Sequence, residues 1–389
     1  MIVYDKNLLK NLFLVDEVQT LQKAHFITKE QMQNAIKELP ILKRQENILI
    51  RLGFFLLGVF LYLSVCGVIS LLGLPIISDS YKAFCYLFAI VGLAGTEFFA
   101  RLTYYGYGLD DAFAFGTLLT LALAIGISTE GNNILAITIT TSIVSLILYL
   151  RYVHLLSIII FCVASIATLG YATYNYLEIG EVILPFVIIL YSILLYYTSN
   201  MFLKNLKAPF YYNGLILVKS ISLLLFYCSG NYYIVRELSA TITFDYYEIS
   251  PEIPFAFFFW GFTFIIPIVY LIFALRNKDR ILLWMGCLAF CFSIFTFRSY
   301  HHILPTEVML TFCGLLLFAF TYFFIKKIKD NVVGLTFKPD RFDNPNALLN
   351  AEALLIASAF NIKPELKVED SPMEFGGGGF SGGGSGESF

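Results

Sequence analysis

A run of apolar segments from Gly53 to Ile325 constrains this chain more than any other feature. Each segment has about the length that an α-helix needs to cross the ~30 Å hydrocarbon core of a bilayer, and short polar stretches separate the segments. Of the 389 residues, 58% are hydrophobic and only 14% are charged, whereas a typical soluble domain has about 25% charged residues. The sequence therefore predicts an all-α fold, a polytopic bundle of transmembrane helices with small helical termini.

The apolar segments divide into about ten spans, of which the third and the ninth are short enough to be tilted or supported by their neighbours. The spans cover residues 53–75, 83–100, 112–128, 133–150, 155–176, 182–203, 209–230, 253–275, 281–297 and 304–325. This count predicts four regions in the chain. They are a cytosolic helical hairpin at 1–50, the transmembrane bundle at 51–329, a cytosolic amphipathic helix at 330–362 and a disordered glycine-rich tail at 363–389.

Positive charges alternate between the loops and so predict the orientation of the bundle, because cytosolic loops carry an excess of Lys and Arg. If the N-terminus is cytosolic, the inner loops hold ten such residues: Arg101, Arg151, Lys204, Lys207, Arg276, Lys278, Arg280, Lys326, Lys327 and Lys329. The outer loops hold three: Lys82, Arg236 and Arg298. The predicted location is the cytoplasmic (inner) membrane, with both termini in the cytosol.

The first 50 residues have the pattern of two short helices joined by a turn. Apolar side chains recur at helical spacing in the first: Leu8, Leu12, Val15, Val18 and Leu21. Thr28 then begins a capping box with Gln31, in which each side chain bonds the other's backbone N–H at a helix start. The second helix should end before Pro40.

The phrase Leu21-Gln-Lys-Ala-His-Phe-Ile-Thr-Lys-Glu-Gln31, followed by a basic stretch and many spans, resembles an uncharacterised bacterial membrane family of the domain-of-unknown-function 2157 type. The resemblance covers about residues 1–70 and extends to the rest only in general architecture. The chain departs from that family at His25, where the family usually has a glycine in a left-handed turn. Because the family has no established activity, the resemblance implies a cytosolic hairpin attached to a bundle and no particular chemistry.

The C-terminal tail has too much glycine to recover its ordering entropy by burial, so we expect it to be disordered. It resembles the glycine-rich C-termini of TPM-domain proteins. Two interpretations stay open: a flexible linker without a partner, or a segment that docks a protein partner through Phe375, Phe380 and Phe389.

Ionisable residues inside predicted spans are candidates for function, because an unpaired charge is costly in hydrocarbon. Lys219 lies within the seventh span, where it either snorkels to the cytosolic end or forms a buried functional pair. Glu97 and Arg101 lie four residues apart on one helix face and can pair. With Asp110 and Asp111, Glu97 places three carboxylates at the inner mouth, which we interpret as a structural ion-pair cluster.

The densest polar group at the predicted outer face contains Arg298, His301, His302 and Glu307. Pro305 can begin the tenth helix, which makes Glu307 a favourable charge at its N-terminus, with Arg298 as counter-ion. The alternative is a divalent metal or proton site, but adjacent histidines point to different helix faces. No metal site and no cofactor are therefore predicted.

The long outer segment 231–252 is predicted to be a solvated acidic loop, in which Thr241-Ile-Thr-Phe244 can form a short strand. A net charge of −2 gives no basic surface for nucleic acid. No catalytic motif is found, so an enzyme is not favoured. Two functions remain. One is a transporter-like or small-solute-binding bundle around Lys219 and the carboxylates. The other is a membrane scaffold or sensor that recruits cytosolic partners through its hairpin and glycine-rich tail. The lipid bilayer is the one predicted partner common to both, and the pattern predicts no oligomeric state.

Overall fold

The computed structural model describes residues 2–23, 27–73, 81–205, 208–242, 252–277 and 279–300, with scattered positions between 308 and 326. Helices are the regular elements in these ranges, so the predicted all-α class is confirmed. The chain divides into two units. One contains Met1–Phe13 and Ile41–Ala347, and the other contains Leu14–Pro40 and Leu348–Phe389.

The N-terminal hairpin forms as its sequence pattern predicts. Helix α1 covers Lys6–Lys23 and α2 covers Lys29–Glu38. Thr28 Oγ1 accepts a hydrogen bond from Gln31 N at 3.3 Å, while the Gln31 side chain accepts one from Thr28 N at 2.9 Å, so the capping box is confirmed. Val18, Ile27 and Ala35 form the buried core of this hairpin. The expected left-handed turn at His25 lies outside the described residues.

Nine helices of the described chain are long and apolar enough to cross a membrane, and they coincide with the first nine predicted spans. The long elements are α3 (Ile48–Gly73), α4 (Tyr81–Arg101), α5 (Leu109–Ser128), α6 (Ile134–Tyr152), α7 (Leu155–Tyr176), α8 (Gly180–Lys204), α9 (Tyr212–Gly230), α11 (Ala256–Asn277) and α12 (Arg280–Tyr300), with the short helices η1 (Pro209–Tyr211) and α10 (Tyr232–Ile242) on either side of α9. The structure describes scattered positions of the predicted tenth span. The predicted amphipathic helix and the tail, beyond residue 326, lie outside the described residues.

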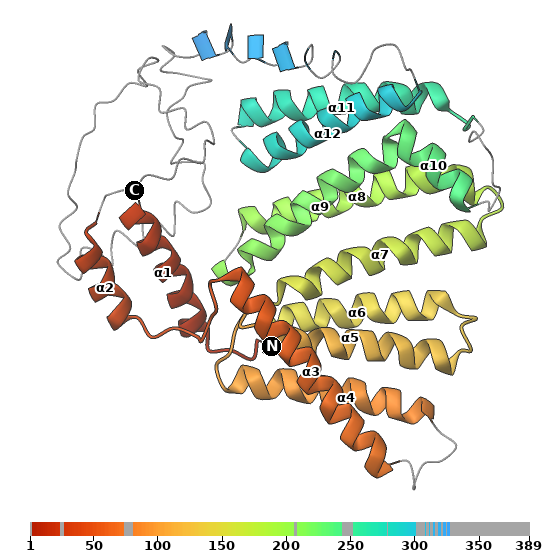
Figure 1. Cartoon of the computed structure of the whole chain (residues 1–389). Coiled ribbons are helices and arrows are strands. Elements are labelled where there is room, and N and C mark those ends of the chain that lie inside the picture. Colours follow the sequence, from red (N-terminus) through yellow and green to blue (C-terminus); the bar gives the residue numbers. More distant parts are fainter. Residues whose placement is uncertain are drawn as a thin grey trace, which may run out of the picture. The chain divides into compact units, whose positions relative to one another are not determined.

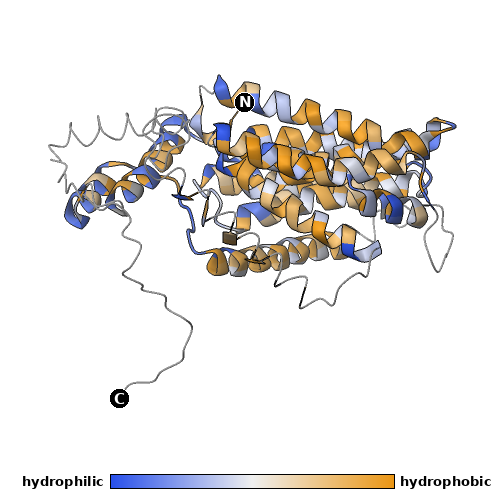
Figure 2. Cartoon of the chain, turned by 90° about the horizontal axis from the view of Figure 1, so that it is seen from above, coloured by the Kyte–Doolittle hydropathy of each residue, from blue (hydrophilic) through white to orange (hydrophobic). Residues whose placement is uncertain are grey.

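Helices that follow one another in sequence pack against one another within the bundle. The packing order runs α4, α5, α6, α7, α8 and α9, after which α9 contacts both α11 and α12; α3 packs on α5 and α4 (Figure 1). Apolar residues run along these helices and hydrophilic ones gather near their ends (Figure 2). This distribution is what a bilayer requires of helices whose outer surfaces face lipid.

Small residues let the first helices of the bundle approach closely. A Cβ atom on Gly95 of α4 would lie 2.2 Å from the Phe113 ring of α5. On α3, a Cβ atom on Gly58 would lie 2.7 Å from Ala112 Cβ. In a membrane, where lipid tails are as apolar as the side chains, helix association depends on such close packing. Glycine at these two positions therefore sets the distance between α5 and its two neighbours.

A buried polar network joins α9, α10, α11 and α12. Asn231 is fully buried and its Oδ1 accepts hydrogen bonds from Tyr233 N and Ile234 N at the start of α10. Its Nδ2 donates to Tyr227 Oη at 2.9 Å and to Thr296 Oγ1 at 3.1 Å. This cap explains why the prediction of a strand at 241–244 is wrong at its first two residues: Thr241 and Ile242 end helix α10. The β-branched residues favoured a strand locally, but a helix start fixed by tertiary contacts prevails.

Pro267 explains why the same network reaches α11. Proline has no N–H, so the carbonyl four residues earlier, that of Thr263, lacks its usual helical donor. Ser293 Oγ of α12 donates to this carbonyl at 2.7 Å, and Thr263 Oγ1 accepts from Tyr232 N at 3.0 Å. The backbone group that proline leaves open is thus used to bind a neighbouring helix.

Candidate functional site

The loops that the charge pattern assigns to the cytosol lie at one end of the bundle. Lys43 N, before α3, donates to Thr103 O in the α4–α5 loop at 2.9 Å. Val3 N donates to Arg151 O at the end of α6, and Tyr211 Oη donates to Leu150 O. These contacts agree with a chain that crosses the membrane once with each long helix. We call this end of the bundle the loop end, and several ionisable side chains are buried there.

The first of these side chains is Asp110, in the opening turn of α5. Its carboxylate accepts three backbone hydrogen bonds, from Gly106 N at 2.7 Å and from Tyr107 N and Gly108 N at 3.0 Å each. Gly106 and Gly108 have φ values of 60° and 111°, a region that glycine adopts without steric cost. A Cβ atom on Gly108 would also lie 2.4 Å from Arg51 O. The Gly-Tyr-Gly sequence therefore shapes a loop whose amides hold a carboxylate.

Asp111 follows on the same turn and is paired with a cation from α3. Arg51 Nε donates to Asp111 Oδ2 at 3.0 Å and Arg51 Nη2 donates to the same oxygen at 2.5 Å. The other carboxylate oxygen, Oδ1, is buried and has no hydrogen-bond partner among the described residues. Arg51 thus binds one oxygen of this carboxylate, Oδ2, and the other oxygen, Oδ1, stays open.

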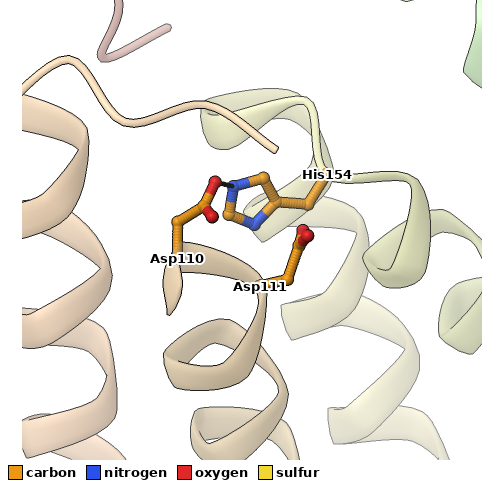
Figure 3. Close-up of side chains that lie close together, drawn as sticks. All are labelled: Asp110, Asp111 and His154. Atoms are coloured by element: carbon orange, nitrogen blue, oxygen red, sulfur yellow. Dashed lines mark ion pairs between the residues drawn. The ribbon is translucent and has the colours of Figure 1, made fainter. Parts of the chain in front are cut away.

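His154 completes what we call the buried charge cluster, namely Arg51, Asp110, Asp111 and His154. It lies in the two-residue connection between α6 and α7, with 2% of its surface exposed. Figure 3 shows the imidazole ring between the two carboxylates, with the ion pair to Asp110 drawn as a dashed line. His154 Nε2 lies 3.2 Å from Asp110 Oδ2. Burial alone would lower the pKa of His154, but the contact with Asp110 and the charge of that carboxylate raise it above its ordinary value.

The N-terminal segment packs beside this cluster. Tyr4 is buried, its hydroxyl donates to Tyr104 O at 3.0 Å, and its ring contacts the Tyr105 ring edge-on. Burial raises the pKa of the Tyr4 hydroxyl, and the nearby negative charge of Asp110 raises it further. Burial also raises the pKa of Tyr105 to about 12. Both phenols therefore stay neutral around the cluster at physiological pH.

Glu97 forms the pair with Arg101 that the sequence predicts, at 3.7 Å, but this is its weaker contact. Arg151 Nη2 donates to both carboxylate oxygens of Glu97 at 2.9 Å, and Tyr152 Oη donates at 2.7 Å. A bidentate guanidinium contact is stronger and more directional than an exposed pair four residues apart. Glu97 therefore ties α4 to α6, a contact that no local spacing could reveal.

Lys219 is buried in α9, and its ammonium reaches the short loop between α11 and α12. Its Nζ lies 2.5 Å from Asp279 Oδ2. Asp279 also accepts hydrogen bonds through Oδ1 from Ile281 N and Leu282 N, so that it caps α12. The Lys219 side chain therefore extends to the loop end of the bundle, as snorkelling predicts. It is also paired there, with Asp279.

A pocket of about 280 Å³ lies at the opposite end of the bundle, where α7 ends and α8 begins. Its walls are mainly apolar and include Leu184, Pro185, Ile188, Ile253 and Phe259. Three charged residues, Glu181, Arg236 and Glu252, also line it. Lys219 is not part of this lining, so the cavity does not reach the residue around which a binding site was predicted.

The arginine of this pocket is held by aromatic residues. Arg236 Nη1 donates to Tyr232 Oη at 3.0 Å, and its guanidinium lies 4.8 Å from the centre of the Tyr300 ring. Glu181 accepts a hydrogen bond from Ser239 Oγ at 2.9 Å. Pro185 cannot donate to the backbone carbonyl of residue 181, which removes one helical bond at the edge of the pocket. The arrangement offers an apolar cavity with fixed charges of both signs.

The remaining predicted site residues are placed only in part. Arg298 lies in the last turn of α12. His301, His302 and Glu307 of the predicted outer cluster lie outside the described residues, as do Phe375, Phe380 and Phe389 of the tail.

The sequence pattern predicted a carboxylate group that includes Asp110 and Asp111. It did not predict that His154 and Arg51 contact these two residues. A lone histidine in a loop and an arginine before the first span carry no local signal for a site. The Gly-Tyr-Gly run before two aspartates was the one available indication.

Comparison of the chain with protein-family models, with curated proteins and with solved structures gives no match.

Proposed function

We propose that this multi-pass membrane protein is a small-solute-binding, transporter-like bundle, with its binding site in the pocket formed by α8, α9, α10 and the start of α11. The pocket is the observation that carries this proposal. At about 280 Å³ it is close to the lower end of the range of roughly 300–1,000 Å³ that small-molecule sites occupy. Apolar walls with a few polar groups are also typical of such sites.

The charges of the pocket indicate the chemical class of the solute. Two carboxylates, Glu181 and Glu252, and one guanidinium, Arg236, give the lining a formal charge of −1. Arg236 is already engaged by two aromatic residues, whereas both glutamates are exposed. The best fit is therefore a small amphiphile with a protonated amine, whose apolar part contacts Leu184, Ile188 and Phe259.

In this proposal the pocket opens on the outer side of the inner membrane. The support is the excess of Lys and Arg in the loops of the opposite end. A solute would reach the pocket from outside the cell, and the buried charge cluster would lie at the cytosolic end.

The test is thermal unfolding of the purified protein in detergent with a panel of small amphiphilic amines, acids and neutral analogues. A ligand that binds only the folded state stabilises it by about 2.7 kcal/mol at a concentration of 100 Kd. We expect an amine to raise the unfolding temperature of the wild type, and Glu181→Gln with Glu252→Gln to remove the shift. Glu130→Gln, which changes an exposed carboxylate in the α5–α6 turn, is the matched control and should keep it.

Two results would contradict this proposal. One is the absence of a shift for every compound of the panel. The other is a shift that persists undiminished in the double glutamate variant, because the solute would then bind elsewhere.

The position of the charges favours a second candidate, a membrane scaffold or sensor. Lys219, Glu97, Arg51 and His154 each form an ion pair at the loop end of the bundle. Ion pairs gathered at one end of the bundle suit an anchor for partners bound by the hairpin and the tail. Loss of a co-purifying protein on deletion of the tail, without any solute effect, would select this candidate.

A further inference from the structure

The buried charge cluster contains three donor side chains that converge from two separate parts of the fold. Asp110 and Asp111 open α5, and His154 comes from the α6–α7 connection. One potential ligand atom from each of them lies within 4.8 Å of those of the other two, and all three residues are buried (Figure 3). The ligand atoms around a zinc-like ion lie about 3.4 Å apart, so small side-chain movements suffice to close the set.

Unpartnered atoms distinguish this cluster from a completed ion-pair network. Within the described part of the chain, Asp111 Oδ1 and His154 Nδ1 have no hydrogen-bond partner, whereas His154 Nε2 lies 3.2 Å from Asp110 Oδ2. The exposed fraction of the side chain is 7% for Asp111 and 1% for His154. Buried polar atoms are nearly always bonded, so an oxygen and a nitrogen left open at one place require an explanation.

We propose that Asp110, Asp111 and His154 bind a divalent transition-metal ion of the zinc class. One imidazole nitrogen with two carboxylates is a ligand set for zinc, iron or manganese, whereas calcium and magnesium prefer sites made of oxygen atoms alone. Three protein ligands leave at least one position for a water molecule or another small ligand. This inference does not depend on the solute pocket, which lies at the other end of the bundle.

The surroundings of the three ligands already have the form of a supporting shell. The amides of residues 106–108 orient the Asp110 carboxylate, and Arg51 binds the oxygen of Asp111 that faces away from the open one. Such outer contacts fix metal ligands in place. With neutral His154 the cluster has two negative charges and one positive, which leaves −1 to attract a cation. The ion binds an unprotonated nitrogen of this neutral imidazole.

The experiment uses the full-length protein in detergent, stripped with a chelator and then titrated with Co²⁺, whose absorption reports its ligands, and with Zn²⁺ in competition. We expect one ion per chain. Asp111→Asn and His154→Gln should each weaken binding by at least about 100-fold, and Arg51→Gln by about 10–100-fold. Glu97→Gln changes a carboxylate at the same end of the bundle that is not a ligand, and it should bind the ion as the wild type does.

A measurement on the wild type keeps the test decisive if the cluster variants do not fold. X-ray absorption of the zinc-loaded protein should show nitrogen and oxygen ligands at about 2.0–2.2 Å and no sulfur at about 2.3 Å. Double substitution of His301 and His302 by alanine should leave binding unchanged. Three results would overturn the proposal: no bound ion in the wild type, sulfur ligands, or loss of binding in the His301/His302 variant.

Discussion

Asn231 allows the sharpest test of how this bundle is stabilised. The change is Asn231→Ala, which removes five hydrogen bonds: two donated to Tyr227 and Thr296, and three accepted from Tyr233 N, Ile234 N and the Thr296 hydroxyl. In membrane proteins a hydrogen bond between side chains contributes about 0.6 kcal/mol on average. Three of the five bonds join side chains and together give about 2 kcal/mol. Loss of the cap at the start of α10 adds about 1 kcal/mol, so the total is about 3 kcal/mol.

The matched control is Asn133→Ala. Asn133 also caps a helix, α6, but it is exposed and its side chain accepts one hydrogen bond, from Ala136 N at 2.9 Å. We expect this change to cost about 1 kcal/mol or less. The difference of about 2 kcal/mol corresponds to a roughly 30-fold change in the unfolding equilibrium at 1.4 kcal/mol per factor of ten.

The free energy of unfolding is measured by reversible SDS titration of the protein in mixed micelles, with helical circular dichroism as the signal. A double-mutant cycle with Thr296→Val should give a coupling energy of about 1 kcal/mol, because two of the five bonds join this pair. Equal destabilisation by Asn231→Ala and Asn133→Ala, or a coupling energy near zero, would refute the view that the buried network holds α9, α10 and α12 together.

Three further predictions concern the ion pair, the orientation and the tail. Asp279→Asn should destabilise the bundle by about 2–3 kcal/mol in the same SDS titration, because it leaves the Lys219 charge buried without a counter-ion. Adding Lys219→Met to this variant should restore most of the lost stability. No recovery would mean that the two residues do not act as a pair. A cysteine at Ser381 in a chain without native cysteines should resist an impermeant thiol reagent in intact cells, while one at Asn132 in the α5–α6 turn should react; the reverse pattern would invert the orientation. Deletion of residues 376–389 should leave insertion and stability unchanged but lose a co-purifying partner, and an unchanged set of co-purifying proteins would make the tail a linker only.

The outer segment 231–252 shows why a local pattern can mislead. Thr241 and Ile242 have β-branched side chains and were predicted to begin a strand, yet they end α10. The start of that helix depends on Asn231, whose partner on α12, Thr296, is 65 residues away in sequence. A residue's partners across helices are not encoded in its own neighbourhood, so the segment could not be assigned from sequence alone.

The sequence by itself determined the all-α class, the positions of nine long apolar helices in the described chain, and the Thr28 capping box. These depend on properties that act locally: the length of an apolar run, which the bilayer thickness sets, and a helix start whose donors lie three residues away. Tertiary structure alone decided which charges pair between different helices and loops. Arg51 meets Asp111 and Lys219 meets Asp279, each pair separated by 60 residues. Which charges pair depends on how the helices pack in three dimensions, and it is this packing that brings His154 to two aspartates.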